Sequence, residues 1–205
     1  DNKHAEAIKY LEAVEARPQA QQYPFALFKL GWAHYNLRHH KKSLDYLEKH
    51  IAYYDEKSKR DQFLSGSDHA IRENSLLDIA LFTFDLTEQD LSSFSPERTL
   101  NYFRKVDLSG SVGKMNLRFA KLMRSHDHFE HMINWKNHVI KNEPTRAETL
   151  DILVTTFEYQ LNKRHYDSIV KTAGDMVAFY KTNETTAAQF ESYTRAQSML
   201  LDTAK

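Results

Sequence analysis

Apolar residues recur along this chain at the three- and four-residue spacing of an amphipathic α-helix. In one segment, Leu150, Leu153, Val154, Phe157 and Leu161 fall on a single face of a helix. The same spacing returns along most of the chain, and no segment shows the sustained alternation that a half-buried strand requires. We therefore predict an all-α fold.

Proline and serine mark the predicted helix ends. Pro18 ends the first helix, because proline cannot donate the helical hydrogen bond. Ser95 is the predicted N-cap of a later helix, with Pro96 in the first helical position. Two irregular stretches are expected between helices, at residues 57–67 and 87–95.

The predicted helices come in pairs that repeat. Phe129 and Tyr166 occupy equivalent places after the turns of two pairs and lie 37 residues apart, and Ala120 and Phe157 in the preceding helices keep the same spacing. Because one helix pair cannot bury its own apolar face, such a period indicates pairs stacked into an α-solenoid. We predict one domain, residues 1–205, built as a right-handed α-solenoid of antiparallel helix pairs.

The expected elements are a lone helix at 3–16, pairs at 24–56, 68–106, 113–142 and 148–182, and a terminal helix at 184–204. The sequence does not begin with Met, and the helical pattern starts within its first few residues. We therefore expect either a piece of a longer protein, with the lone helix as a half repeat, or a processed chain.

Composition narrows the class of partner. The chain has 28 Lys and Arg against 28 Asp and Glu, without the basic excess of a dedicated nucleic-acid binder. It has no cysteine, which excludes thiolate metal sites, and no uninterrupted apolar run long enough to span a bilayer. Basic groups at residues 38–42 and 57–60 are either phosphate or lipid contacts or solvated turns, and the zero net charge favours solvated turns.

No catalytic motif is present. Residues 110–114, Gly-Ser-Val-Gly-Lys, share part of a phosphate-binding loop, but the glycine spacing, the following Met115 and the helical context differ from that motif. The chain is predicted to be no enzyme and to hold no cofactor.

One histidine cluster offers candidate metal ligands. His128 and His131 lie three residues apart and could share a helix face with His126 nearby, while Asp127 or Glu130 could add an oxygen ligand. The alternative is a solvated turn in which Asp127 is the N-cap. A metal-binding regulatory domain is therefore one alternative function.

Residues 26–37 and 43–47 resemble one unit of the tetratricopeptide repeat (TPR) family. The first helix carries leucines, Leu30-Gly31 and aromatics, and Gly31 without a side chain would let the partner helix approach closely. Pro144 matches the proline that closes a unit, whereas Ser43, Ala120 and Phe157 depart from the pattern.

Residues 23–32 resemble segments of bacterial cell-envelope TPR proteins. These proteins include outer-membrane assembly lipoproteins and the large repeat proteins of gliding motility. That resemblance implies the bacterial periplasm or cell envelope, with the cytoplasm as the alternative.

The resemblance also implies a concave groove lined by the first helix of each pair. An aromatic stripe on residues 28–35 would contribute to it. The implied groove residues are Phe28, Trp32, Tyr35, Asn36, Lys121, Arg124, Glu158 and Asn162. The alternative for the aromatic stripe is packing against the neighbouring repeat. The lysine and asparagine pattern of the family's carboxylate clamp is not repeated between units.

These residues would form a mixed-charge groove, which suits a peptide or protein partner better than a polyanion. We therefore expect a non-catalytic protein–protein interaction scaffold whose rigid groove binds a protein segment. A structural spacer or self-assembly segment within a larger repeat protein is the second alternative.

Overall fold

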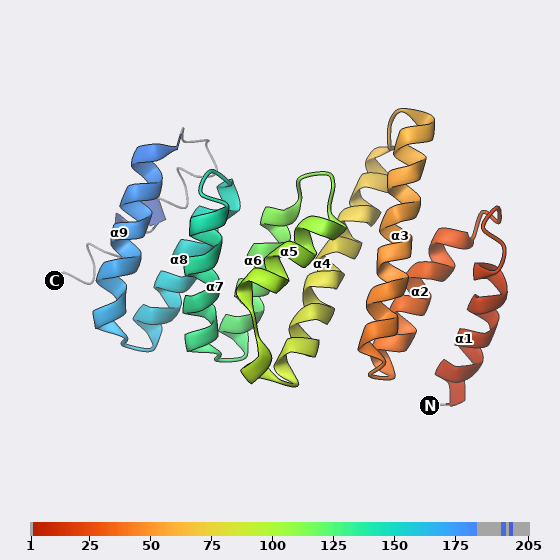
Figure 1. Ribbon diagram of the computed structural model, residues 1–205, viewed down its shortest axis with the longest axis horizontal. Helices are drawn as coiled ribbons and strands as arrows, with labels where there is room; N and C mark the ends of the chain where they lie inside the picture. The colour runs from red at the N-terminus through yellow and green to blue at the C-terminus, as the bar shows by residue number, and fades with distance from the viewer. Residues whose placement is uncertain (1, 184–193, 196, 199–205) are drawn as a thin grey trace. The chain divides into compact units, whose positions relative to one another are not determined.

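The computed structural model describes residues 2–183, 194, 195, 197 and 198, and the regular elements of this part of the chain are all helices, without a strand. Figure 1 shows the course of the helices. They are α1 (Asn2–Glu15), α2 (Tyr23–Asn36), α3 (His40–Asp61), α4 (Gly66–Glu88), the short 3-10 helix η1 (Leu91–Ser93), α5 (Pro96–Val106), α6 (Val112–Ser125), α7 (Phe129–Asn142), α8 (Ala147–Asn162) and α9 (Tyr166–Thr182). The all-α prediction is confirmed. Among the described residues, no helix is long and apolar enough to span a membrane.

Two of the expected boundaries need correction. Residues 57–61 belong to α3 and are not irregular, because this polar stretch continues the helix until Gln62 adopts a left-handed φ of 62°. Between residues 87 and 95, α4 continues to Glu88 and η1 follows. The Ser95 cap is confirmed, since its Oγ accepts the Arg98 N–H at 3.3 Å. Most of the expected helix 184–204 lies outside the described residues.

The chain forms two compact units. Unit 1 comprises residues 1–93 and 103–111, and unit 2 comprises residues 94–102 and 112–205. In unit 1, α1 packs on α2, α2 on α3 and α3 on α4. In unit 2, α6 and α8 pack directly on each other, α7 contacts both, and α9 packs on α8.

Close helix packing in unit 1 depends on a residue without a side chain. A Cβ atom on Gly31 of α2 would lie 3.0 Å from Leu47 Cδ2 of α3, so the predicted close approach of the partner helix is confirmed. Leu30 and Ala33 on the same helix bury against Ile8 of α1. Apolar contacts therefore hold α2 between its two sequence neighbours.

A buried arginine explains why residues 103–111 belong to unit 1. The side chain of Arg72 on α4 is 4% exposed, and its Nε lies 2.7 Å from Asp55 Oδ1 on α3. Its Nη1 lies 3.3 Å from Asp107 Oδ1 and donates to Ser109 Oγ at 2.7 Å. The guanidinium therefore ties α3, α4 and the segment after α5 together.

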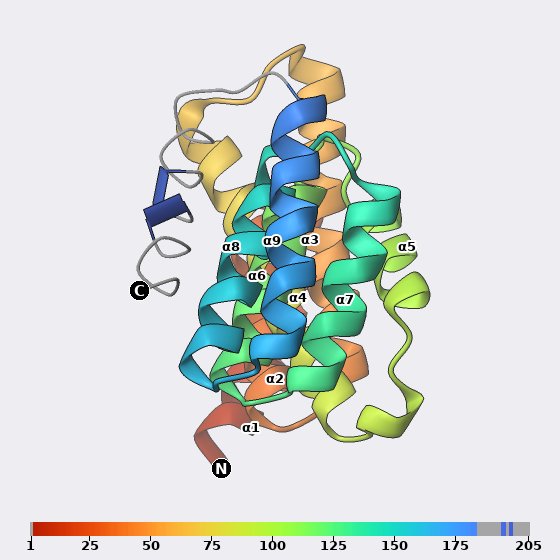
Figure 2. The same ribbon diagram turned by 90° about the vertical axis from the view of Figure 1, so that its left-hand side faces the viewer.

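The core of unit 2 forms around α8. Residues 152–160 of this helix are all buried. Its apolar side chains Leu153 and Phe157 pack with Ile169, Met176 and Phe179 of α9. Figures 1 and 2 both show α9 running beside α8. Helix α8 thus buries the apolar face that the periodic sequence pattern predicts.

One interhelical turn occurs three times with the same backbone geometry. It joins α2 to α3, α6 to α7 and α8 to α9, and its central residue is left-handed each time: Arg38 (φ 60°), Asp127 (φ 64°) and Arg164 (φ 60°). The next residue is a histidine N-cap in all three, namely His39, His128 and His165.

The hydrogen bonds of these turns match as well. Each histidine N–H reaches the carbonyl five residues back at 2.9 Å, as His39 does to His34. Each left-handed residue donates to the carbonyl three residues back, at 2.8 Å for Arg38 and 3.2 Å for Asp127. This is the Schellman arrangement, which usually takes glycine at the left-handed position. Asp127 is therefore the left-handed residue of its turn and not the N-cap.

Candidate functional site

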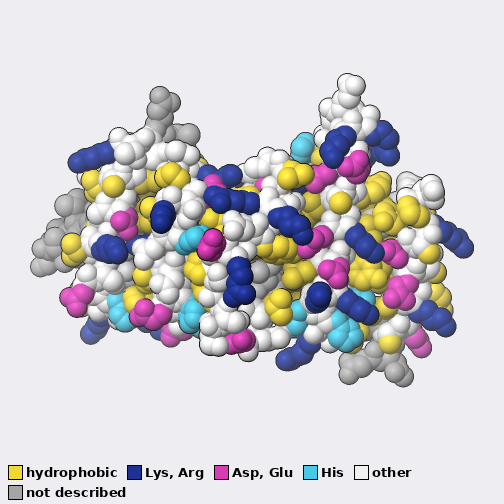
Figure 3. All heavy atoms as spheres, in the orientation of Figure 1, with side chains coloured by type: hydrophobic (Ala, Val, Ile, Leu, Met, Phe, Trp, Pro, Cys, Tyr) yellow, Lys and Arg dark blue, Asp and Glu magenta, His cyan; other side chains and the backbone are white. Residues whose placement is uncertain are grey.

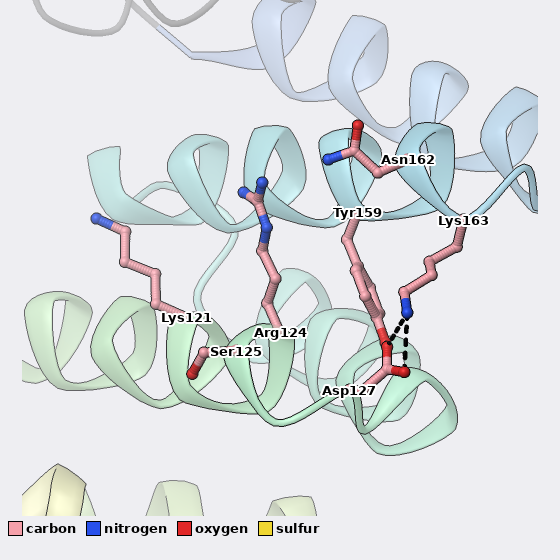
Figure 4. Close-up of a pocket in the computed structure, with 7 residues that line it drawn as sticks. All are labelled: Lys121, Arg124, Ser125, Asp127, Tyr159, Asn162 and Lys163. Carbon is pink, nitrogen blue, oxygen red and sulfur yellow. Dashed lines mark hydrogen bonds and ion pairs between the residues drawn. The ribbon is translucent and has the colours of Figure 1, made fainter.

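A hollow of about 560 Å³ lies between α6 and α8 of unit 2 (Figure 4). We call it the charged hollow. Its lining consists of Lys121, Arg124, Ser125, Asp127, Tyr159, Asn162 and Lys163. The two helices pack directly, so the hollow sits on a rigid base. Three of the predicted groove residues, Lys121, Arg124 and Asn162, lie in it.

One end of the charged hollow is fixed by a tyrosine and a lysine that share one carboxylate. The Tyr159 hydroxyl, from a side chain buried in α8, donates to Asp127 Oδ1, and Lys163 Nζ lies 2.8 Å from Oδ2. The Lys163 hydrogen bond, followed by the Tyr159 bond, lowers the pKa of Asp127. Burial, followed by the Asp127 bond, raises the pKa of Tyr159. Tyr159 is therefore a neutral donor that ties the α6–α7 turn to α8, and not a nucleophile.

The middle of the hollow is fixed by an ion pair. Arg124 Nη1 lies 2.7 Å from Glu158 Oε2, and Glu158 is 9% exposed. Glu158 also pairs with Arg195 at 2.7 Å. Glu158, predicted as a groove residue, therefore lies beside the hollow and orients the Arg124 guanidinium.

Within the part of the chain that the structure describes, two lining residues have polar groups without a polar partner. Lys121 and Asn162 are both exposed, and neither has a hydrogen bond or ion pair to another described residue. The lining carries three cationic side chains against the single carboxylate of Asp127. The hollow is thus suited to an anionic group that also accepts or donates a hydrogen bond at an amide.

The other predicted groove residues lie in unit 1, where the aromatic side chains contact α4. Trp32 Nε1 donates to Asp78 Oδ2 at 3.0 Å, and the Tyr35 hydroxyl donates to Asp85 Oδ2. Phe82 meets the Trp32 ring edge-on at 5.1 Å and stacks on the Tyr35 ring at 4.0 Å. We call these five residues the aromatic seam.

The remaining two lie beside the aromatic seam. Phe28 is half-buried against His50, with ring centroids 5.6 Å apart, and Asn36 is exposed. In the seam, burial, followed by the bond to Asp85, raises the pKa of Tyr35. The Trp32 N–H and the Tyr35 O–H therefore both form hydrogen bonds within unit 1. This favours the alternative that Trp32 and Tyr35 pack against a neighbouring helix.

Ser125, Asp127, Tyr159 and Lys163 line the hollow but were not among the predicted groove residues, and Asp127 was considered only as a metal ligand or an N-cap. Tyr159 and Lys163, the C-cap of α8, lie four residues apart, so the sequence indicates that they share a helix face. The sequence does not indicate that Asp127 is their common partner, because Asp127 lies in the turn between two other helices.

The basic segment at residues 57–60 and the glycine-containing segment at residues 110–114 both have structural roles. Lys57, Lys59 and Arg60 each pair with a nearby carboxylate, at 2.5 to 2.9 Å. Gly110 is left-handed with φ 96°, α6 starts at Val112, and a Cβ on Gly113 would lie 2.3 Å from Glu148 Oε2. The absence of a side chain at Gly113 therefore lets α6 pack closely against Glu148 of α8.

Three histidines gather at the α6–α7 turn. The ring centroids of His126 and His128 are 6.2 Å apart, and those of His128 and His131 are also 6.2 Å apart. The ring nitrogens of His126 and His128 lie within 4.8 Å of each other, so these two imidazoles are close enough to share a metal ion after small side-chain rotations.

No protein-family model matches the chain, and a comparison with curated proteins gives no match.

Proposed function

We propose that this protein is a non-catalytic scaffold that binds a peptide or protein segment in the charged hollow. The observation that carries the proposal is the pair Lys121 and Asn162, exposed and without partners among the described residues, on a floor fixed by the Arg124–Glu158 and Tyr159–Asp127–Lys163 contacts. Because these contacts are already formed, the receptor loses little conformational entropy on binding.

The chemistry of the hollow indicates an acidic segment as the partner. Lys121 supplies an ammonium group for a carboxylate, and the Asn162 amide can pair with a peptide group of an extended chain. Figure 3 shows Lys and Arg interspersed with Asp and Glu over the face that it presents. Recognition would accordingly be local to the hollow and weakened by salt.

We further propose that the helix pairs are units of a TPR-like solenoid. The three matching Schellman turns support this, because a left-handed residue followed by a histidine N-cap joins a first helix to a second helix in each case. The bacterial envelope and gliding-motility setting that the resemblance implies stays a prediction.

Selection from a random peptide display library tests the binding proposal. We expect enriched peptides to be acidic and to bind a Lys121→Ala/Asn162→Ala variant at least tenfold more weakly than the native chain. Lys171→Ala, which removes an exposed lysine of α9 away from the hollow, is the matched control and should bind as the native chain does. Failure to enrich any peptide, or equal binding by the double variant, would contradict the proposal.

A further inference from the structure

The α6–α7 turn places histidines at three positions that its backbone brings together. Asp127 is left-handed, so the chain reverses between His126 and His128. Inside a helix, side chains two residues apart point in divergent directions. Across this turn the ring nitrogens of His126 and His128 lie within 4.8 Å of each other.

His131 lies near His128 because of their positions at the start of α7. His128 is the N-cap of α7 and His131 is the third helical residue. Side chains at the N-cap and third helical positions face each other, which is the basis of the capping box. His128 makes no side-chain capping hydrogen bond, and its ring meets the His131 ring edge-on at 78°.

We propose that His126, His128 and His131 form a binding site for a divalent transition metal ion that prefers imidazole ligands, with zinc as the first candidate. Tetrahedral zinc holds imidazole nitrogens at about 2.1 Å, which places two of them about 3.4 Å apart. The ring nitrogens of His126 and His128 lie within 4.8 Å of each other, and the ring centroids of His128 and His131 are 6.2 Å apart, so metal binding requires these side chains to rotate towards one another.

The set supplies three neutral nitrogen ligands and leaves the fourth position to water. Asp127 is not counted among the ligands, because its carboxylate already accepts hydrogen bonds from Tyr159 and Lys163. Without an anionic ligand, we expect micromolar rather than nanomolar affinity.

The chain provides its own matched control. His165 is the N-cap of the third Schellman turn, with the same backbone geometry, but Lys163 and Ser168 occupy the positions that correspond to His126 and His131. The turn at His39 is a poorer control, because His34 Nδ1 lies 3.3 Å from His39 Nδ1 and could itself chelate a metal ion.

Isothermal titration of the untagged chain with ZnCl₂ at pH 7.5 tests the site. We expect one equivalent to bind, to be lost or weakened at least tenfold in His128→Asn and in His126→Asn, and to be retained in His165→Asn. Circular dichroism should show that all three variants keep the native helical content.

Thermal unfolding supplies a second readout. Zinc should raise the Tm of the native chain and of His165→Asn, since an ion that binds only the folded state stabilises it. The shift should vanish in His128→Asn. Absence of zinc binding by the native chain, or undiminished binding by His128→Asn, would overturn the assignment.

Discussion

The aromatic seam of unit 1 and the charged hollow of unit 2 use similar side chains in different ways. In the seam, Trp32 and Tyr35 give their N–H and O–H groups to Asp78 and Asp85, and Phe82 fills the space between the rings. In the hollow, Tyr159 is likewise held by an aspartate. There, however, exposed polar side chains lie beside it without partners among the described residues.

The comparison shows that an aromatic stripe on a helix does not by itself identify a binding face. A tyrosine or tryptophan whose polar atom is already bonded contributes mainly packing. Available donors beside a rigid floor are the stronger indication of a partner site. If this is correct, substitutions in the seam should change stability, and substitutions in the hollow should change binding.

The largest expected effect is that of Trp32→Ala in the aromatic seam. The substitution removes the contact with Phe82 and leaves Asp78 without the indole donor. We expect a loss of about 3–4 kcal/mol in the free energy of unfolding. Urea unfolding followed by circular dichroism measures it, with Lys121→Ala as the comparison, which should stay within about 0.5 kcal/mol of the native chain.

Acid should destabilise unit 1 through a buried histidine beside the seam. His50 lies 2.9 Å from Ser75 Oγ, and burial lowers its pKa from 6.5 to about 4. Below pH 6.5, His50 takes up a proton in the unfolded chain, whereas in the folded chain it stays neutral until about pH 4. This stabilisation is therefore complete above pH 6.5 and declines by about 3 kcal/mol as the pH falls to 4.

Hydrogen exchange with peptide resolution, measured between pH 7 and pH 4.5 and corrected for the intrinsic rate, locates this effect. Protection in α3 and α4 should fall with acid in the native chain and fall less in His50→Asn. The same acid response in both proteins would assign the effect to other groups.

A smaller effect is expected for Tyr159→Phe in the charged hollow. The ring stays, but the buried hydroxyl and its bond to Asp127 are lost. We expect a loss of about 1 kcal/mol in the free energy of unfolding. Because Asp127 also loses a donor that lowers its pKa, the carboxyl group should titrate at a higher pH than in the native chain, which NMR titration of the Asp127 side chain would detect. An unchanged pKa would mean that Lys163 alone sets it.

The helices were predictable because each buries a continuous apolar face with a period close to 3.6 residues. The end of α3 was not, since residues 57–61 are polar and carry no periodic signal. The three Schellman turns could not be predicted from the sequence either. Glycine usually occupies the left-handed position of such a turn, whereas this chain has Arg38, Asp127 and Arg164 there.

Some of the residues in and beside the hollow were named from the sequence on a different basis, the family resemblance. The resemblance to the TPR family assigned Lys121, Arg124, Glu158 and Asn162 to one surface, and the structure places them in or beside one hollow. The partner of Trp32 lies 46 residues away, so only the tertiary structure reveals that Asp78 accepts its N–H.

The most direct test compares binding of one library-selected peptide by two folded variants. Trp32→Phe/Tyr35→Phe keeps aromatic packing in the seam while removing both hydrogen bonds, and Lys121→Ala/Asn162→Ala removes the available groups of the hollow. We predict unchanged affinity for the first variant and at least a tenfold loss for the second. Lost affinity in the seam variant with full affinity in the hollow variant would contradict the account.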